Sequence, residues 1–170
     1  MKVGLEIRRA TADDLEEVLL LERETGSAPH WGWTVYDAML SQGGGDGVRR
    51  VLFVAADGKV ISGFAVGKVL GDEAEIESVV VREGMRRQGL GSTLCRAVME
   101  WAREHDACTV VLEVRQGSAG AVQLYGGLGF VTVGRRTRYY KEPIEDAVLM
   151  KCELGGGRCS EGELFPAGTI

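Results

Sequence analysis

A single carboxylate interrupts an apolar stretch of this sequence. Glu113 lies within Val110-Val111-Leu112-Glu113-Val114, a run typical of a buried strand. A carboxylate in such a strand costs several kcal/mol unless it is paired or solvated. An ion pair with Arg115 on the same strand face is one explanation. We favour a functional one, since buried acids in clefts gather at active sites.

A second candidate is the phenol of Tyr125, in Leu124-Tyr125-Gly126-Gly127-Leu128-Gly129-Phe130. An aromatic residue late in a short amphipathic helix is usually core packing. The flanking glycines, however, allow a backbone or a cofactor to approach closely. A phenol with an ordinary pKa of about 10 can donate a proton to a leaving thiolate. Both interpretations therefore stay open.

The third feature is a basic, glycine-bearing loop. An apolar strand ending in Val79-Val80-Val81 leads into Arg86-Arg87-Gln88-Gly89-Leu90-Gly91, and a long amphipathic segment follows. Backbone N–H groups at a helix start lack partners within the helix, and the helix dipole favours negative charge there. Glycines let the backbone approach a phosphate without intervening side chains. The stretch therefore predicts a site for a phosphorylated cofactor.

Hydrophobic periodicity places these residues on a series of short elements. In order, we expect a strand at Leu5–Arg9, a helix begun by Thr11-Ala12-Asp13-Asp14, a short helix at Thr34–Leu40, a hairpin of Val51–Ala56 and Val60–Leu70 around Asp57-Gly58, a strand ending near Val81, a helix of about four turns from Leu90, a strand at Thr109–Val114, a helix at Ser118–Gly126, and strands at Phe130–Tyr139 and Ala147–Glu153. This order predicts one α/β domain over residues 1–154, with a mixed, mostly antiparallel sheet flanked by helices. Residues 155–170 are expected to form a mobile glycine-rich tail outside the fold.

The composition of the 170-residue chain limits its partners. A net charge of −5 argues against direct binding to nucleic acid, which needs a basic face. The acidic balance suits a cationic acceptor such as a basic peptide, although solubility is the simpler explanation. No apolar stretch is long enough to cross a bilayer, and the N-terminus has no signal-peptide pattern, so we expect a cytoplasmic protein without a membrane partner.

The cysteines and histidines do not have the spacing of a metal site. Cys95, Cys108, Cys152 and Cys159 form no C-x-x-C pair, and the two histidines lie far apart in the sequence. We therefore expect no metal, and free thiols in a reducing cytosol.

Together these motifs resemble the GNAT family of acetyl-CoA-dependent N-acetyltransferases. The resemblance is strongest to the RimI-type branch, which acetylates the N-terminal alanine of a small-subunit ribosomal protein. It spans Leu5 to about Glu153. The loop Arg86-x-x-Gly89-x-Gly91 is similar to the family's pyrophosphate-binding pattern. The motifs more typical of the branch are Leu112-Glu113-Val114-Arg115, Leu124-Tyr125, Leu128-Gly129-Phe130, Arg138-Tyr139-Tyr140 and Glu145-Asp146-Ala147.

The resemblance implies a role for each of these segments. Glu113 would be the general base, directly or through water, and Tyr125 the general acid for the departing CoA thiolate. The backbone of Val79, Val80 and Val81 would hold the pantetheine arm and acetyl group, where neighbouring parallel strands separate after Val81. The pyrophosphate would be held by the amides of Arg87, Gln88, Gly89, Leu90, Gly91 and Ser92, in the loop opened by Arg86.

Two parts of the resemblance are less complete. Ser118 stands where RimI-type enzymes usually carry asparagine; serine can cap the following helix and bond the cofactor, but it offers fewer donors. The resemblance also places Ser27–Trp33 and the hairpin near Tyr139 over the acceptor groove. Trp31, Trp33 and Tyr139 are then either walls of the groove or ordinary packing residues.

We therefore expect a monomer or weak dimer that transfers acetyl from acetyl-CoA to a protein N-terminal α-amine by direct attack. Cys95, next to Leu94 on the expected helix, reads as a packing residue and not as an acyl carrier. An acetyltransferase for lysine or for a small-molecule amine would share the fold and cofactor loop. A non-catalytic acetyl-CoA-binding module is the third alternative, although it would not need an acid and a base.

Overall fold

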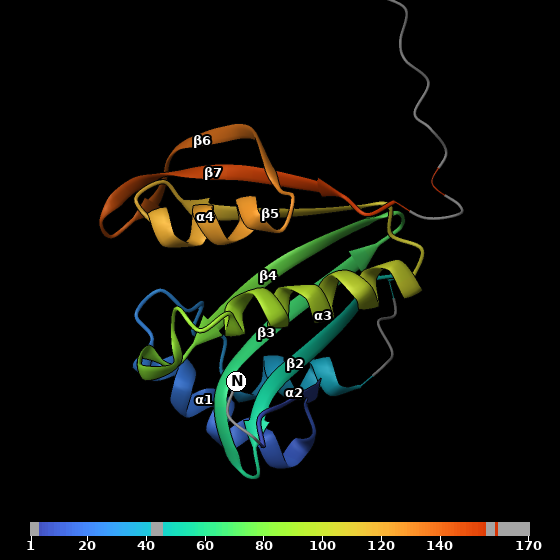
Figure 1. Cartoon of the computed structure of the whole chain (residues 1–170), viewed down its shortest axis with the longest axis vertical. Coiled ribbons are helices and arrows are strands. Elements are labelled where there is room, and N and C mark those ends of the chain that lie inside the picture. Colours follow the sequence, from blue (N-terminus) through green and yellow to red (C-terminus); the bar gives the residue numbers. More distant parts are fainter. Residues whose placement is uncertain (1–3, 42–45, 156–158, 160–170) are drawn as a thin grey trace, which may run out of the picture.

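The computed structural model describes residues 4–41, 46–155 and 159, and its elements follow the expected order (Figure 1). The strands are β1 (Glu6–Arg9), β2 (Arg49–Asp57), β3 (Val60–Leu70), β4 (Glu73–Val81), β5 (Thr109–Arg115), β6 (Val131–Lys141) and β7 (Ile144–Glu153). The helices are α1 (Leu15–Glu24), α2 (Trp33–Leu40), α3 (Leu90–Glu104) and α4 (Ala119–Gly127). A short 3-10 turn at Ala12–Asp14 precedes α1, where the sequence predicted one continuous helix. The Thr11 N–H donates to Asp14 Oδ2 at 2.8 Å and so caps this turn.

The seven strands form one mixed sheet in the order β1-β2-β3-β4-β5-β7-β6. The pairing of β4 with β5 is parallel, and the other five pairings between described strands are antiparallel. The expected mixed, mostly antiparallel sheet is therefore confirmed. The hairpin of β2 and β3 turns at the predicted Asp57-Gly58, where Gly58 has φ +60°.

The parallel pair separates early. β4 and β5 are paired only from Glu73–Thr109 to Glu75–Val111, and beyond that point the two strands diverge (Figure 1). The expected separation is thus present, but it begins after Glu75 and not after Val81. Glu77 is an extra residue in β4, because Ser78 pairs with Val66 while Ile76 pairs with Gly67. Such a bulge bends a strand and increases its twist, which helps to turn β4 away from β5.

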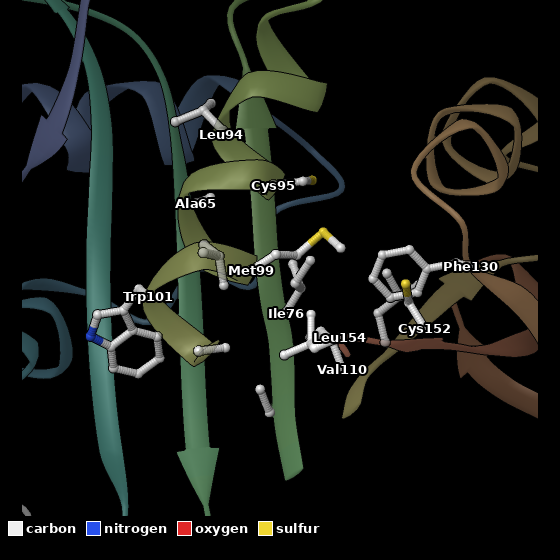
Figure 2. Packing of buried hydrophobic residues seen from close by; sticks show 14 of the residues in the cluster. Ala65, Ile76, Leu94, Cys95, Met99, Trp101, Val110, Phe130, Cys152 and Leu154 are labelled. Atoms are coloured by element: carbon white, nitrogen blue, oxygen red, sulfur yellow. The ribbon is translucent and has the colours of Figure 1, made fainter. Parts of the chain in front are cut away.

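Two buried clusters cover the two faces of the sheet. Figure 2 shows side chains of α3 over the strand residues Ala65 and Ile76, with Met99 extending toward Phe130 and Cys152. On the opposite face, α1 and α2 bury Leu15 and Tyr36 against Phe64. A Cβ on Gly67 of β3 would lie 2.5 Å from Val98 Cγ1, so the missing side chain is what lets α3 pack this closely.

The expectation of four free thiols is wrong for one pair. Cys108 and Cys159 form a disulfide, with Cα atoms 5.4 Å apart, whereas Cys95 and Cys152 are free and buried. The Leu154 N–H donates to the Cys108 carbonyl at 2.8 Å, so the end of β7 runs beside the start of β5 and brings the chain back to Cys108. The predicted tail otherwise falls on residues 156–158 and 160–170, which lie outside the described residues.

Candidate active site

The loop before α3 presents an open helix start. Gly89 is the N-cap residue, with φ +81°, and no side chain caps the helix there. Arg87 also has a positive φ, +60°, a conformation that non-glycine residues adopt only at some cost. Arg86, Arg87, Gln88 and Gly89 are all exposed. Because the first N–H groups of a helix lack intrahelical partners and no side chain caps this one, the loop remains the predicted pyrophosphate site.

Side chains and close packing shape this loop from within. Arg86 Nε donates to the Val81 carbonyl at 3.1 Å, and Gln88 Nε2 donates to the Gly84 carbonyl at 3.2 Å. A Cβ on Gly91 would lie 2.8 Å from Leu124 Cδ1. Gly91 therefore leaves room for Leu124 where α3 contacts α4, whereas Gly89 is the glycine that the loop conformation requires.

The end of β4 keeps one edge free for a ligand. Val79, Val80 and Val81 pair with β3 on one side, and the pairing with β5 on the other side has already ended. Val80 is buried in the cluster under α1 and α2, while Val79 and Val81 pack toward α3. Backbone groups on the β5 side of this segment therefore have no partner from β5, although the Val81 carbonyl accepts from Arg86 Nε.

Glu113 lies two residues beyond the last β4–β5 pair. Val110, Leu112 and Val114 point into the α3 cluster, so the strand alternation places Glu113 on the opposite face, where its side chain is 26% exposed. Glu113 Oε1 lies 3.0 Å from Arg136 Nε. The alternative pairing with Arg115 is wrong, because Arg115 bonds Glu145 at 3.4 Å, across the β5–β7 pairing. Sequence proximity could not reveal Arg136, which comes from the edge strand β6.

A bulge in β6 carries Tyr139 to Glu113. Arg136 pairs with Ala147 and Tyr140 with Glu145, so three residues of β6, 137–139, lie opposite Asp146 alone. Asp146 Oδ1 accepts from the Arg138 N–H at 2.8 Å and holds the bulge in place. The negative charge of Glu113 raises the pKa of Tyr139. Tyr139, predicted at the acceptor groove, therefore lies against the predicted base.

Tyr125 and Tyr140 extend the site toward α4. Burial raises the pKa of Tyr125 well above its usual value, and the nearby Cys95 and Tyr140 add to the effect. The ring of Tyr125 packs edge-on against Phe130, with centroids 5.8 Å apart. The site thus keeps Tyr125 protonated at neutral pH, as a proton donor must be.

Tyr140 was not predicted as a site residue. Burial raises the pKa of Tyr140, the positive charge of Arg115 lowers it, and the negative charge of Glu113 raises it further. Tyr140 in turn raises the pKa of Tyr125. Arg115 Cζ lies 4.0 Å from the Tyr140 ring centroid. Tyr140 therefore lies within electrostatic range of both predicted catalytic residues. The adjacent pair Tyr139-Tyr140 is the sequence signal that could have indicated it.

The two predicted tryptophans occupy different places. The backbone N–H of Trp31 donates to Glu22 Oε1 at 2.9 Å, and the centroid of its indole ring lies 5.9 Å from that of the Tyr36 ring. Trp33, at the start of α2, is 51% exposed and lines a surface cavity of about 1010 Å³ with residues of α1 and the β2–β3 turn. Neither Glu113 nor Tyr139 lines that cavity.

Two smaller expectations concern Ser118 and Cys95. Ser118 is the N-cap residue of α4, but its side chain makes no capping hydrogen bond, so the expected cap is wrong. Its carbonyl instead accepts from the Val122 N–H at 3.0 Å. Cys95 is fully buried, and burial raises the pKa of its thiol to about 12. A thiol in this state is a poor nucleophile, which agrees with a packing role.

The described part of the chain contains neither a cluster of metal ligands nor a membrane-spanning helix. Residues 4–41, 46–155 and 159 contain no group of three or more histidine, cysteine or acidic residues that could hold a metal ion. Among the same residues, no helix is both long enough and apolar enough to cross a membrane.

The separated parallel pair, the uncapped helix start and the acid on the diverging strand define an N-acyltransferase fold. The chain belongs to the acetyltransferase (GNAT) family, whose model matches residues 13–130, and it is an enzyme of the acyltransferase class. A Bacillus subtilis protein, named provisionally as a ribosomal protein bS18-alanine N-acetyltransferase, is 29% identical over 150 residues, covering 88% of this chain and 96% of the relative.

Solved structures agree with this assignment. The crystal structure of the ribosomal-protein-S18-alanine N-acetyltransferase from Escherichia coli matches with a TM-score of 0.75 and 26% identity, over 90% of this chain and 96% of that one. A Bacillus anthracis protein crystallised with acetyl coenzyme A matches with a TM-score of 0.56 and 27% identity, over 61% of this chain and 62% of that one. The predicted resemblance to the ribosomal-protein branch is thereby confirmed.

Proposed function

We propose that this enzyme transfers an acetyl group from acetyl-CoA to the N-terminal α-amine of a protein, in particular the N-terminal alanine of a small-subunit ribosomal protein. One observation carries the proposal. Glu113 stands on the open face of β5, just where β5 leaves β4 and where the free edge of β4 leads to the uncapped start of α3. The names of the B. subtilis and E. coli relatives support this choice of acceptor.

Main-chain groups would hold the donor. Acetyl-CoA, when bound, supplies the acetyl group as an activated thioester. The backbone of Val79–Val81 is assigned to the pantetheine arm and the acetyl group, and the amides of residues 87–92 to the pyrophosphate, as in the sequence prediction. Ser118 is assigned a cofactor contact through its hydroxyl, which caps no helix.

Glu113 and Tyr125 would move the two protons. Glu113 takes a proton from the acceptor ammonium, directly or through water. The neutral amine nitrogen then attacks the thioester carbonyl, so that a C–N bond forms and the C–S bond breaks. Tyr125 donates its proton to the departing sulfur. The attacking nitrogen loses its second proton to solvent as the amide forms, and solvent returns a proton to Tyr125. Only the neutral amine attacks, and an α-amine, with a pKa of about 7.7–8.0, needs less help from a carboxylate than lysine at about 10.4.

Direct attack in a ternary complex fits the chain better than an acyl-enzyme. Cys95 is the free cysteine nearest in sequence to the cofactor loop, and it is buried with a raised pKa. We place the reaction in the cytoplasm, and we propose that the enzyme acts as a monomer or weak dimer. Trp31, Trp33 and Tyr139 remain assigned to the acceptor side.

The test uses purified enzyme, acetyl-CoA and small-subunit ribosomal proteins from the host. Mass spectrometry should find acetyl on one protein N-terminus, and a thiol assay should show CoA release. Matched peptides with free and blocked N-termini provide the control, because a lysine acetyltransferase would accept both. Activity with the blocked peptide, or with small amines alone, would reassign the acceptor. CoA binding without turnover on any amine would identify a regulatory module.

A further inference from the structure

The carboxylate assigned as general base already has a cationic partner. Arg136 Nε lies 3.0 Å from Glu113 Oε1, and the side chain of Arg136 is 55% exposed against 26% for Glu113. An acceptor amine approaches as an ammonium ion and needs the same carboxylate. The arginine and the acceptor therefore compete for one partner.

The fold holds Arg136 beside Glu113 without burying it. Arg136 pairs with Ala147 just before the β6 bulge, so its backbone is the last regular position on that side. Its guanidinium lies 5.5 Å from the ring centroid of Tyr139, the residue that the bulge directs to Glu113. Because more than half of the side chain is in solvent, Arg136 can turn outward without opening the core.

Other charges near Glu113 already have partners of their own. Arg115 bonds Glu145, and Lys68 bonds Glu75, the other carboxylate that acts on Tyr139. Among the described residues, Arg136 is the one that forms an ion pair with Glu113. Removing this cation would leave a half-buried carboxylate without compensation, unless another positive charge takes its place.

We propose that Arg136 is a resident counter-ion of Glu113 which the acceptor ammonium displaces, so that Arg136 competes with the cationic amine for Glu113 and raises the acceptor KM. The exchange keeps the charge at Glu113 balanced, since one positive group leaves for solvent as another arrives. A neutral group, such as a blocked N-terminus, cannot replace Arg136 on equal terms. The identity of the incoming amine rests on the proposed function; the counter-ion itself does not.

The kinetic test compares Arg136→Met with Arg136→Lys, which keeps the charge. Arg135→Met is the matched control, because this neighbouring exposed arginine bonds Gln116 and not Glu113. Without a competing cation, Arg136→Met should lower the KM for the acceptor peptide roughly 1.5- to 5-fold at low salt, the range expected for an exposed ion pair. The KM of Arg136→Met for acetyl-CoA should stay close to that of the wild type. The KM of Arg136→Lys for the acceptor peptide should also stay close to the wild-type value, because the charge is kept. The effect should disappear in a Glu113→Gln background.

A second measurement does not depend on activity. The chain has four tyrosines, so ring-labelled tyrosine gives few NMR signals, and Tyr139→Phe identifies the one that matters. Glu113 raises the pKa of Tyr139 and Arg136 lowers it. The pKa of Tyr139 should therefore rise in Arg136→Met and fall in Glu113→Gln, and it should not move in Arg135→Met.

The outcomes separate the two proposals. A lower acceptor KM together with the shifted Tyr139 titration supports the counter-ion. A raised acceptor KM would make Arg136 an ordinary substrate contact and overturn it, as would an unchanged Tyr139 titration. If the wild-type enzyme acetylates no α-amine but Tyr139 still responds to Arg136→Met, the proposed acceptor is wrong while the contact with Glu113 stands.

Discussion

The hydroxyl of Tyr36 donates a hydrogen bond to Glu22 Oε1 over 2.6 Å, inside the apolar cluster between α1, α2 and the sheet. Glu22 is 2% exposed, and the same oxygen accepts from the Trp31 N–H. Trp31 stands between His30 and Gly32, which both have positive φ, 55° and 81°. One buried carboxylate thus joins both helices to an unusual loop on the assigned acceptor side.

Removing the hydroxyl should destabilise the fold. In Tyr36→Phe the ring can keep its edge-on contact with Phe64, while the buried Glu22 loses one donor. The free energy of unfolding should fall by about 1–3 kcal/mol, the usual cost of an unsatisfied buried polar group. Urea unfolding measures this, with the exposed Tyr139→Phe as control. An equal, small effect in both variants would show that the buried bond contributes little.

Glu113→Gln should slow acetyl transfer most strongly at low pH. A missing general base typically costs roughly 100-fold or more. The loss should shrink above about pH 8, because an α-amine with a pKa of about 7.7–8.0 is then mostly neutral without help. The measurement is kcat/KM between about pH 6 and 9, with the exposed Glu153→Gln on β7 as control. An equal turnover of variant and wild type at every pH would exclude Glu113 as the base.

Tyr125→Phe should lower kcat and leave the KM for acetyl-CoA nearly unchanged. The phenylalanine can keep the contact with Phe130, so the loss should reflect the missing proton donor and be roughly 100-fold. Burial raises the pKa of Tyr125. Deprotonation of Tyr125 should therefore not reduce the activity of the wild-type enzyme at any pH below about 10. Equal kcat in the two proteins would make Tyr125 a packing residue.

Asp14 should make the free energy of unfolding depend on pH in the acidic range. Two hydrogen bonds from Arg8, of 2.7 and 2.9 Å, are the main cause that lowers the pKa of Asp14 from 3.8 to about 2. A lowered pKa stabilises the fold above the unfolded value, and the contribution is lost as pH falls from about 4 toward 2. Asp14→Asn should therefore cost about 2 kcal/mol at neutral pH. The difference in the free energy of unfolding between wild type and variant, measured in urea, should shrink as the pH falls from about 4 toward 2. A difference that does not change with pH would contradict the assignment.

Much of the fold could be predicted because its signals are short-range. The Asp57-Gly58 turn, the alternation around Glu113 and the Gly89 loop each depend on a few neighbouring residues, and the structure contains all three. Turn chemistry and side-chain periodicity act over such distances. The family resemblance then indicated how these pieces belong together.

What the amino-acid order alone determined is the set of elements, their sequence and the candidate acid and phenol. The tertiary structure decided which distant residues meet them. Glu113 meets Arg136 and not Arg115, Cys108 meets Cys159 across 51 positions, and Trp33 faces a separate cavity. The β4–β5 pair also ends earlier than expected. The reason is that strand order, register and bulges bring residues from different strands together, and the spacing within any single segment carries no record of that pairing.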